Sequence, residues 1–566
     1  MKVSKKLQKV LSVVLAVALL LGMSGIPAQS LQAEEIPVIA VKGPADGVAQ
    51  GDIVILYDND VHCAVDGYAS IAALKKDMLE KTSNVALVSN GDFIQGATMG
   101  ALSKGETIID IMNQVGYDVT TLGNHEFDYG IEQLRMLTNK FQAKVVSCNY
   151  MDLETKKAVY PSYTMKKYGD KKVAFVGIST PESFTKSTPT FFQDENGKYI
   201  YSFSEDKTGK QLFARVQKTV NVARKAGADY VVALAHLGID GATIPEWTST
   251  GVIENTTGID ILLDGHSHST FASTLVKNKD GKEVVSSSTG SKFNNIGKLV
   301  IAEDGKITTD LVSLKSYTKT DKDVKEYIAA EKAKLKEQTG KVIGKTEFKL
   351  TTMAPDGKKR AVRNAETNLG DFCADALRNV LEADVAIMNG GGIRADIPAG
   401  DITYDSLITV FPFGNMGCTV QATGQQLKDA LEMGASLYPE ENGGFLHVSG
   451  MKYTIDPSIP SSVKKDEKGM FKSVNGKYRV TEVMVLNSKT KKYEKLDLKK
   501  KYVLAGINYT LRNGGDGYTM FMNDKVLKDD TVGDNELLIK YLTENLKGEV
   551  SKEYSNLSGE GRLTIK

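Results

Sequence analysis

The stretch LGNHEFDYG, residues 122–130, gathers an amide, an imidazole and two carboxylates between two glycines. Side chains of these types can bind metal ions or transfer protons. Ordinary core packing gives no reason to place them together just after the run DVTTL, residues 118–122. The stretch therefore predicts a site for metal binding or acid–base chemistry.

Four further stretches carry side chains of the same kind. They are DNDVH (58–62), SNGDFIQG (89–96), ALAHLG (233–238) and DGHSHS (264–269). Each alone is a weak signal, because a single Gly-Asp is usually a turn and a single histidine is more often structural. Together with the opening stretch they contain five of the six histidines of the chain, and in this combination the five stretches predict a metal centre.

The mixture of ligand types indicates which metal to expect. Carboxylate, imidazole and amide oxygen together suit zinc or manganese better than calcium or magnesium. A carboxylate on a tight turn, such as Gly91–Asp92, can bridge two ions about 3.5–4 Å apart, an arrangement that serves phosphoryl transfer. The sixth histidine, His447, lies in no motif, and we expect it to be structural.

The elements that must position these residues alternate between residues 50 and 315. Short apolar runs, typical of buried strands in α/β domains, alternate with segments that carry apolar residues at helical spacing. The predicted strands are 53–57, 85–88, 119–122, 173–178, 231–235 and 259–263, and the predicted helices include 68–81 and 210–227. The polar stretches follow the carboxyl ends of predicted strands, where open α/β sheets bind ligands.

The second half of the chain has a different pattern. Residues 321–338 read as an exposed helix, and a further helix is predicted over 368–383. Strand and turn signals dominate the rest, and the charged segment 460–476 is expected to be a surface loop. The predicted organisation is an α/β domain over 50–320, a linker helix over 321–342 and a second domain over 343–566.

Residues 1–33 have the pattern of a secretory signal peptide: a basic start, the apolar core VLSVVLAVALLLG and then small residues. They predict an exported protein, extracellular, cell wall-associated or periplasmic, without a membrane anchor after cleavage. Without the four lysines of this segment, 67 basic side chains balance 70 acidic ones. Charge therefore gives no reason to expect nucleic acid as a partner, and the spacing of the four cysteines argues against a disulfide framework.

The five polar stretches resemble, in order, the metal motifs of the exported 5'-nucleotidase family of calcineurin-like metallophosphoesterases. This family includes periplasmic UDP-sugar hydrolase and the ecto-5'-nucleotidases, and the resemblance covers nearly all of the chain after residue 33. It implies an N-terminal metallophosphoesterase α/β sandwich and a C-terminal α/β 5'-nucleotidase domain that binds substrate. It also implies two divalent ions, one held by Asp60, His62, Asp92 and His268, the other by Asp92, Asn124, His236 and His266.

The same resemblance gives roles to the opening stretch. His125 would face the phosphate, stabilise the transition state and protonate the leaving oxygen. Asp128, three residues on, would hold its imidazole in the useful tautomer and raise its basicity. Glu126 is expected to be structural, and Cys63 to be a buried thiol that points away from the ions.

Substrate-binding residues are implied in the second domain, where glycine N–H groups and arginine side chains can bind an anion. They are Arg363, Asn389, Arg394, Phe413 and Asp516. Phe413 would be one of two rings around the nucleobase, and Asp516 would hold the ribose hydroxyls. Two positions depart from the family pattern: Ala365 replaces a frequent arginine, and Thr510, beside Tyr509, stands where the second ring normally lies.

The sequence therefore predicts a 5'-nucleotidase that cleaves nucleoside 5'-monophosphates, with nucleotide sugars as further candidates, by a metal-activated water. A hinge rotation near the linker helix would bring substrate and ions together. Two alternatives stay open. The same site could hydrolyse 2',3'-cyclic nucleotides or other phosphoesters, or the chain could be a non-catalytic surface-binding protein that kept the fold. Nothing in the sequence indicates an oligomeric state.

Overall fold

The computed structural model of the protein describes residue 45 and residues 47–566, without the side chains of residues 530 and 531. The predicted signal peptide, residues 1–33, lies outside the described residues. Within them, no helix has the length and apolar character needed to cross a membrane. The described residues belong to one compact unit of the chain.

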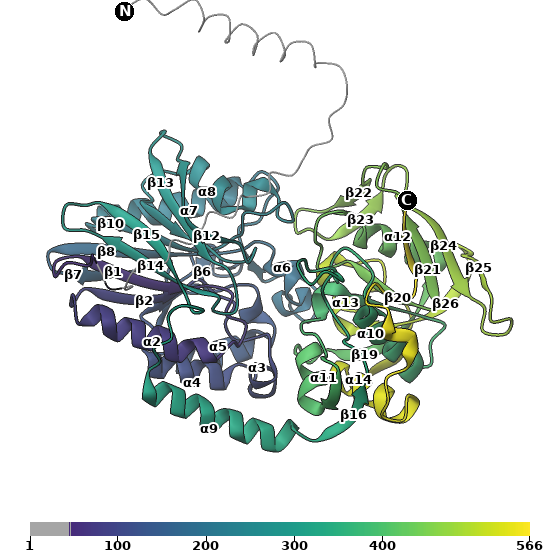
Figure 1. The fold of residues 1–566 in the computed structure, drawn as a ribbon. Coiled ribbons are helices and arrows are strands. Elements are labelled where there is room, and N and C mark those ends of the chain that lie inside the picture. The colour runs from purple at the N-terminus through teal and green to yellow at the C-terminus, as the bar shows by residue number, and fades with distance from the viewer. Residues whose placement is uncertain (1–44, 46) are drawn as a thin grey trace, which may run out of the picture. The chain divides into compact units, whose positions relative to one another are not determined.

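Two six-stranded sheets form the amino-terminal half of the described chain (Figure 1). The first has the order β15 (Ile307–Ser313), β14 (Asn295–Ile301), β1 (Ile53–Asp58), β2 (Val85–Ser89), β3 (Val119–Thr120) and β4 (Lys144–Val145). The second has the order β12 (Thr270–Lys277), β13 (Glu283–Thr289), β11 (Ile261–Leu263), β10 (Tyr230–His236), β8 (Lys171–Ser179) and β7 (Tyr163–Tyr168). Strands β1 to β4 are parallel, as are β8, β10, β11 and β13. Within each sheet the carboxyl ends of these parallel strands therefore lie along one edge.

The two sheets share a core, and helices cover their outer faces. Ile55 and Phe175 lie in the core between the sheets, whereas Val54 and Leu56 pack against helices, because successive side chains of a strand point to opposite faces. The covering helices are α2 (Asp66–Leu79), α4 (Glu106–Val115), α5 (Ile131–Lys140), α7 (Lys210–Lys225) and α8 (Ser249–Asn255). This sandwich confirms the predicted fold class.

The predicted strand over 119–122 is shorter than expected. Strand β3 contains only Val119 and Thr120. After it the backbone turns into the polar stretch 122–130, where the N–H of Gly123 donates to the Glu126 carboxylate at 2.7 Å. The N–H of Thr121 still donates to the carbonyl of Ser89 on β2 at 3.1 Å, and after it the Glu126 side chain replaces the neighbouring strand as the partner of the backbone.

The carboxyl-terminal half contains two further large sheets. One has the order β20 (Leu446–Ser449), β17 (Val385–Asn389), β26 (Lys501–Ile507), β19 (Met416–Thr423) and β27 (Val526–Gly533). The other has the order β25 (Tyr493–Lys495), β24 (Val480–Leu486), β21 (Met451–Ile455) and β28 (Leu563–Ile565). Helices α10 (Asn368–Val380), α12 (Gly424–Gly434) and α14 (Asp534–Lys540) complete its two cores.

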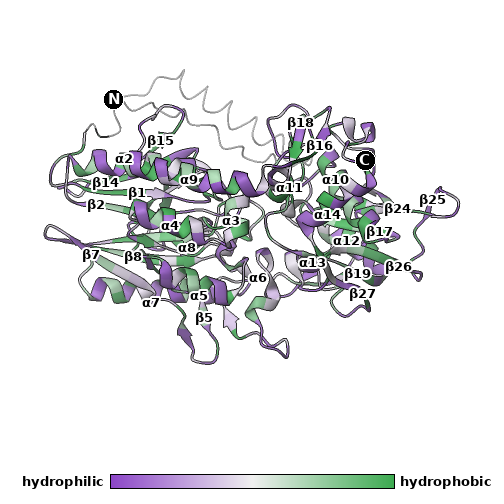
Figure 2. Cartoon of the chain, turned by 90° about the horizontal axis from the view of Figure 1, so that it is seen from below, coloured by the Kyte–Doolittle hydropathy of each residue, from purple (hydrophilic) through white to green (hydrophobic). Residues whose placement is uncertain are grey.

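Helix α9 (Lys322–Thr339) lies between the two halves in the sequence. Val324 and Ile328 pack on the core around α2 and α4, while the rest of the helix is mostly hydrophilic (Figure 2). This is the pattern of a helix with one narrow apolar face.

Residues 460–476 lie mostly at the surface, as expected, but they do not form an irregular loop. Strand β22 (Val463–Lys465) pairs with β23 (Phe471–Val474) in a hairpin. Between them, Lys468 pairs with Glu205 and lies 4.2 Å from the ring centre of Phe184. The sequence did not indicate this hairpin, because its strands have only three and four residues. It also did not indicate the ion pair, because Glu205 lies 263 positions from Lys468.

His447 on β20 is buried in the carboxyl-terminal half, as expected for a structural residue. Its Nε2 donates to the carbonyl of Val362 at 2.8 Å, and its buried Nδ1 has no hydrogen-bond partner. A Cβ atom on Gly370 would come within 1.9 Å of Nδ1, so the ring fits tightly against that glycine. Burial lowers the pKa of His447 to about 4, because the cationic ring would place an N–H in the core without an acceptor.

Acid should therefore destabilise the protein through His447. The unfolded chain binds a proton at this ring below pH 6.5 and the folded chain only near pH 4, so this contribution is present at neutral pH and declines as pH falls. Between pH 7 and pH 5 the loss should be about 2 kcal/mol. Urea denaturation at both pH values should show a smaller loss for His447→Phe than for the wild type. Equal losses would contradict this role.

Candidate metal centre and substrate cleft

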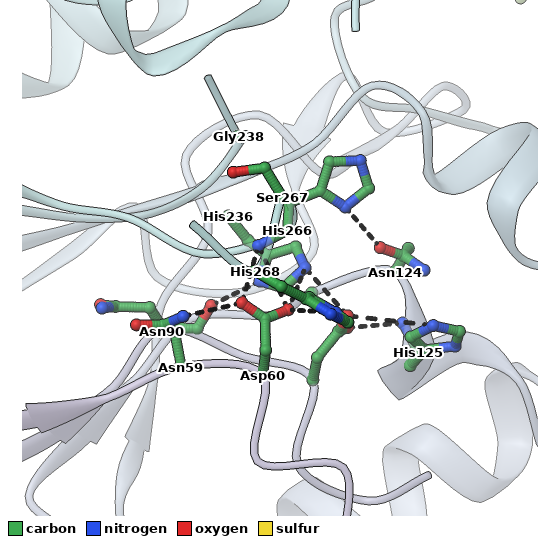
Figure 3. A network of polar contacts seen from close by, with 12 residues as sticks. Asn59, Asp60, Asn90, Asn124, His125, His236, Gly238, His266, Ser267 and His268 are labelled. Carbon is green, nitrogen blue, oxygen red and sulfur yellow. Dashed lines mark hydrogen bonds and ion pairs between the residues drawn. The ribbon is translucent and has the colours of Figure 1, made fainter. Parts of the chain in front are cut away.

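The predicted metal ligands come together where strands end (Figure 3). Figure 3 shows Asp60, His236 and His268 directed toward one another, and Asn124 linked to His266. The full predicted set is Asp60, His62, Asp92, Asn124, His236, His266 and His268, placed after β1, β2, β3 and β11 and at the end of β10. Residues more than 200 positions apart in sequence thus form one cluster, as the bond between Asp60 and His266 shows.

Five of the predicted ligands have a left-handed backbone conformation, which is rare for residues other than glycine. They are Asp60 (φ 50°), His62 (46°), Asp92 (60°), His266 (77°) and His268 (55°). Such conformations cost of order 1–3 kcal/mol each and persist where the surroundings impose them. Here the backbone N–H of His266 donates to Asp60 at 3.0 Å, and that of His125 donates to Asp92 at 2.9 Å. The turns thereby fix both carboxylates.

The two buried carboxylates favour a positive charge between them. His236 Nε2 lies 3.1 Å from Asp92 Oδ2 and 3.8 Å from Asp60 Oδ1. Burial raises the pKa of Asp60 to about 6. Burial lowers the pKa of His236, but the charges of Asp92 and Asp60 outweigh it and raise that pKa to about 10. A divalent metal ion would supply this charge with the ring neutral.

The ring nitrogens that face this centre are suited to metal binding. The Nδ1 atoms of His236 and His62 lie 2.7 and 3.1 Å from the carbonyls of Asn90 and Gln95, which only accept, so in a neutral ring Nε2 carries the lone pair. His236 Nε2 is buried without a hydrogen bond, and His62 Nε2 faces His268 Nε2 at 3.0 Å. Imidazoles oriented by carbonyls around carboxylates fit a divalent metal ion.

His266 and Asn124 give the same indication. His266 Nε2 donates to Glu182 Oε2 at 2.7 Å, which leaves Nδ1 unprotonated in the neutral ring, 2.9 Å from Asn124 Oδ1. In this state His266 Nδ1 and Asn124 Oδ1 are both acceptors, and a cation that binds both atoms would stabilise their close approach. Sequence reasoning did not name Glu182. Burial raises the pKa of this carboxyl, but the hydrogen bond from His266 and nearby positive charge outweigh it and lower that pKa to about 2.

Glu126 fixes the backbone around Asp92 and Gly123, which agrees with the structural role expected for it. Its carboxylate accepts hydrogen bonds from the backbone N–H groups of Asp92, Phe93 and Gly123 at 2.8, 2.9 and 2.7 Å. The thiol of Cys63 donates to the carbonyl of Phe93 and so points away from the ligands, as expected.

His125 and Asp128 form a pair at the edge of the centre. His125 Nδ1 donates to Asp128 Oδ2 at 2.5 Å, and its Nε2 lies 4.0 Å from Asp92 Oδ2. Burial lowers the pKa of His125, but Asp128 and Asp92 outweigh it and raise that pKa. A ring with raised basicity, held in one orientation, is suited to proton transfer beside the metal ligands.

A cleft joins this centre to the predicted substrate residues, which all line it: Arg363, Asn389, Arg394, Phe413 and Asp516. Burial and the neighbouring arginines lower the pKa of Arg363 and of Arg394, so an anion between them would relieve an unfavourable charge. Arg360, which sequence reasoning did not name, also lines the cleft and pairs with Glu441.

Thr510 stands at the position of the family's second ring, but the neighbouring residue Tyr509 supplies an aromatic ring to the cleft. Thr510 is buried, and its hydroxyl donates to the carbonyl of Ile507 within its own turn. Tyr509 lines the cleft, and its hydroxyl accepts from the backbone N–H of Asp516 at 3.0 Å. The cleft therefore contains two candidate rings, Phe413 and Tyr509, although the expected position does not supply one.

Comparisons with known proteins agree with this geometry. Residues 53–270 match the family of calcineurin-like phosphoesterases, so fold and site define a metallophosphoesterase. Residues 342–523 match the C-terminal domain of 5'-nucleotidases. The chain therefore belongs to the 5'-nucleotidase family of metallophosphoesterases, which are metal-dependent hydrolases of phosphoric esters.

Individual relatives cover most of the chain. A 5'-nucleotidase precursor from Thermus thermophilus has a crystal structure similar over 91% of this chain and 99% of its own, with a TM-score of 0.74 and 25% identity. The 5'-nucleotidase of Bos taurus is 27% identical over 87% of this chain and 88% of its own. A trifunctional nucleotide phosphoesterase protein of Bacillus subtilis (strain 168) is 27% identical over 92% of this chain, which spans 35% of that protein's length.

His125 and Asp128 should act as one unit. His125→Ala is expected to slow hydrolysis of p-nitrophenyl phosphate about 10²–10⁴-fold, the usual contribution of a general acid or base. Because Asp128 would act through the ring, the variant with both residues changed to Ala should be no slower than His125→Ala. Steady-state rates with Glu132→Ala, an exposed carboxylate, as control would test this. Losses that multiply in the double variant would contradict the pairing.

Glu182 should strengthen metal binding by orienting His266. Glu182→Ala is expected to weaken metal affinity about 10–100-fold, the usual effect of losing a partner behind a histidine ligand. Titration of the apoprotein with zinc by calorimetry, with Glu254→Ala as exposed control, would measure the change independently of activity. Unaltered affinity in Glu182→Ala would show that the contact with His266 has no role in metal binding.

Proposed function

We propose that the protein is an exported 5'-nucleotidase, which hydrolyses nucleoside 5'-monophosphates to a nucleoside and phosphate. One observation carries this proposal: a single cleft is lined by predicted metal ligands and by the predicted nucleoside-binding residues. Relatives named 5'-nucleotidase that align over most of both chains support it. Export is supported by the sequence pattern of residues 1–33. The reaction would release phosphate and a nucleoside that the cell can import and reuse.

The centre would hold two divalent ions, zinc or manganese, bridged by Asp92. Support for the bridge comes from Asp92 Oδ2, which lies 3.1 Å from His236 Nε2 and 4.0 Å from His62 Nε2. The mixture of nitrogen and oxygen donors supports the choice of metal. When bound, such ions activate water and neutralise the charge of a phosphate.

The chain's own residues would bind and orient the ester. Arg363 and Arg394 donate to the phosphate oxygens, because guanidinium groups match the geometry of phosphate. His125 gives a proton to the leaving 5'-oxygen from Nε2, while Asp128 holds its Nδ1–H. Asp516 accepts hydrogen bonds from the ribose hydroxyls.

The domain limits 50–320, 321–342 and 343–566 belong to the same proposal. Helix α9 falls within the linker range, and residues of both domain ranges line the cleft. A nucleotide bound to the second domain would thus place its phosphate against the centre of the first. A hinge rotation near the linker would admit the substrate and release the products.

A panel of substrates tests the proposal. The metal-saturated protein should release phosphate from AMP faster than from UDP-glucose, cyclic 2',3'-AMP or a sugar phosphate. Chelation should abolish turnover, and added zinc or manganese should restore it. Faster cleavage of another ester on the panel would overturn the proposed substrate. Turnover that resists chelation, or no turnover of any ester, would overturn the proposed chemistry, and the latter would favour a binding protein.

A further inference from the structure

Lys186 reaches the predicted ribose-binding residue from the amino-terminal half of the chain. It ends the short helix α6 (Ser183–Lys186), which follows strand β8 and lies against the turn of residues 515–517. Its Nζ lies 3.4 Å from Asp516 Oδ1, and both residues line the cleft. No motif in the sequence singles out this lysine.

Both members of this pair are held by other contacts. Asp516 has a left-handed backbone (φ 52°), and its Oδ2 accepts from Asn389 Nδ2 at 2.9 Å. Helix α6 is anchored by the carbonyl of Thr185, which accepts from Tyr509 Oη at 2.6 Å. The distance of 3.4 Å between Lys186 and Asp516 is longer than a usual hydrogen bond. Their two facing atoms can therefore take up a ligand group without either residue moving far.

The two groups have complementary hydrogen-bonding needs. An ammonium group only donates and a carboxylate only accepts, whereas a hydroxyl does both. A hydroxyl beside the pair can thus accept from Lys186 and donate to Asp516, and a vicinal diol offers one hydroxyl to each. A phosphate group of the ligand would bind poorly beside this pair, because the negative charge of Asp516 would repel it.

Gly443 leaves room for such a group. A Cβ atom at this position would lie 3.5 Å from Asp516 Oδ1 and 3.7 Å from Lys186 Nζ. The glycine lines the same cleft, so the space that a side chain would occupy there is beside both charged atoms.

Lys186 carries its charge at neutral pH. Burial lowers its pKa, but the carboxylates of Asp516 and Glu182 outweigh this effect and raise the pKa. The amino group therefore stays a donor over the range in which the site would work.

We propose that Lys186 is a specificity-determining residue, which recognises the 2',3'-diol of a ribonucleotide together with Asp516. The inference rests on the proposed function and names the sugar that this site selects. It predicts a preference for ribose over sugars that lack these hydroxyls.

Comparison of AMP with 2',3'-dideoxy-AMP tests this role. Lys186→Met should lower kcat/KM for AMP about 10-fold, mainly through KM, because one hydrogen bond to a charged group is lost. The kcat/KM for 2',3'-dideoxy-AMP should stay within about twofold, since no such bond exists there. Lys186→Arg should retain most of the AMP preference. Lys198→Met, an exposed lysine of the same half, should behave as wild type.

Gly443→Val provides a second test, because it fills the space beside the pair and leaves both charges in place. It too should reduce the preference for AMP. Equal losses of kcat/KM on both nucleotides in Lys186→Met would mean that the lysine only holds the two halves together. No loss on either nucleotide would mean that it has no role. Either result would overturn this inference and leave the proposed function in place. Wild-type protein that cleaves p-nitrophenyl phosphate but neither nucleotide would overturn the proposed function as well.

Discussion

The structure depends on one electrostatic constraint: two buried carboxylates, Asp60 and Asp92, face the same histidine rings, and this arrangement requires positive charge between them. Burying two ionised carboxylates close together costs much free energy unless positive charge compensates them. Carbonyls of Asn90 and Gln95 already bind the Nδ1–H groups of His236 and His62. Without a metal ion, the positive charge would have to come from a proton on Nε2 of His236, whose pKa the two carboxylates raise to about 10. Divalent metal ions resolve this conflict, and phosphate chemistry follows from their charge.

Two features of the fold bring these side chains together. Parallel strands bring the ends of β1, β2, β3, β10 and β11 to one place, and left-handed turns then aim the side chains at a common point. Behind the ligands, Glu126 fixes the backbone around Asp92, and Glu182 orients His266. Glu182 also precedes the helix that carries Lys186, so a single short segment contacts a predicted metal ligand and the predicted nucleoside site.

Much of this could be predicted from the sequence, because the predicted ligands lie in short motifs directly after strands, and apolar runs indicate those strands. Glu182, Lys186 and Arg360 could not, since their roles come from contacts with residues distant in sequence and no motif surrounds them. The hairpin over 463–474 was missed for another reason, because its two strands have only three and four residues. Tyr509 was named only as the neighbour of Thr510, and the structure shows that it lines the cleft. Local pattern indicates which residue types end a strand. Packing between distant segments decides which side chain enters a cleft.

The central claim concerns cations gathered by these side chains, and their direct observation tests it. Crystals of the protein grown with zinc or manganese would be measured at the absorption edge of the metal, where anomalous scattering locates each ion. The account predicts two anomalous peaks, one on each side of the Asp92 carboxylate, within bonding distance of His62 and His236 respectively. A fully loaded crystal with no peak at Asp92, or with its metal bound elsewhere, would contradict it.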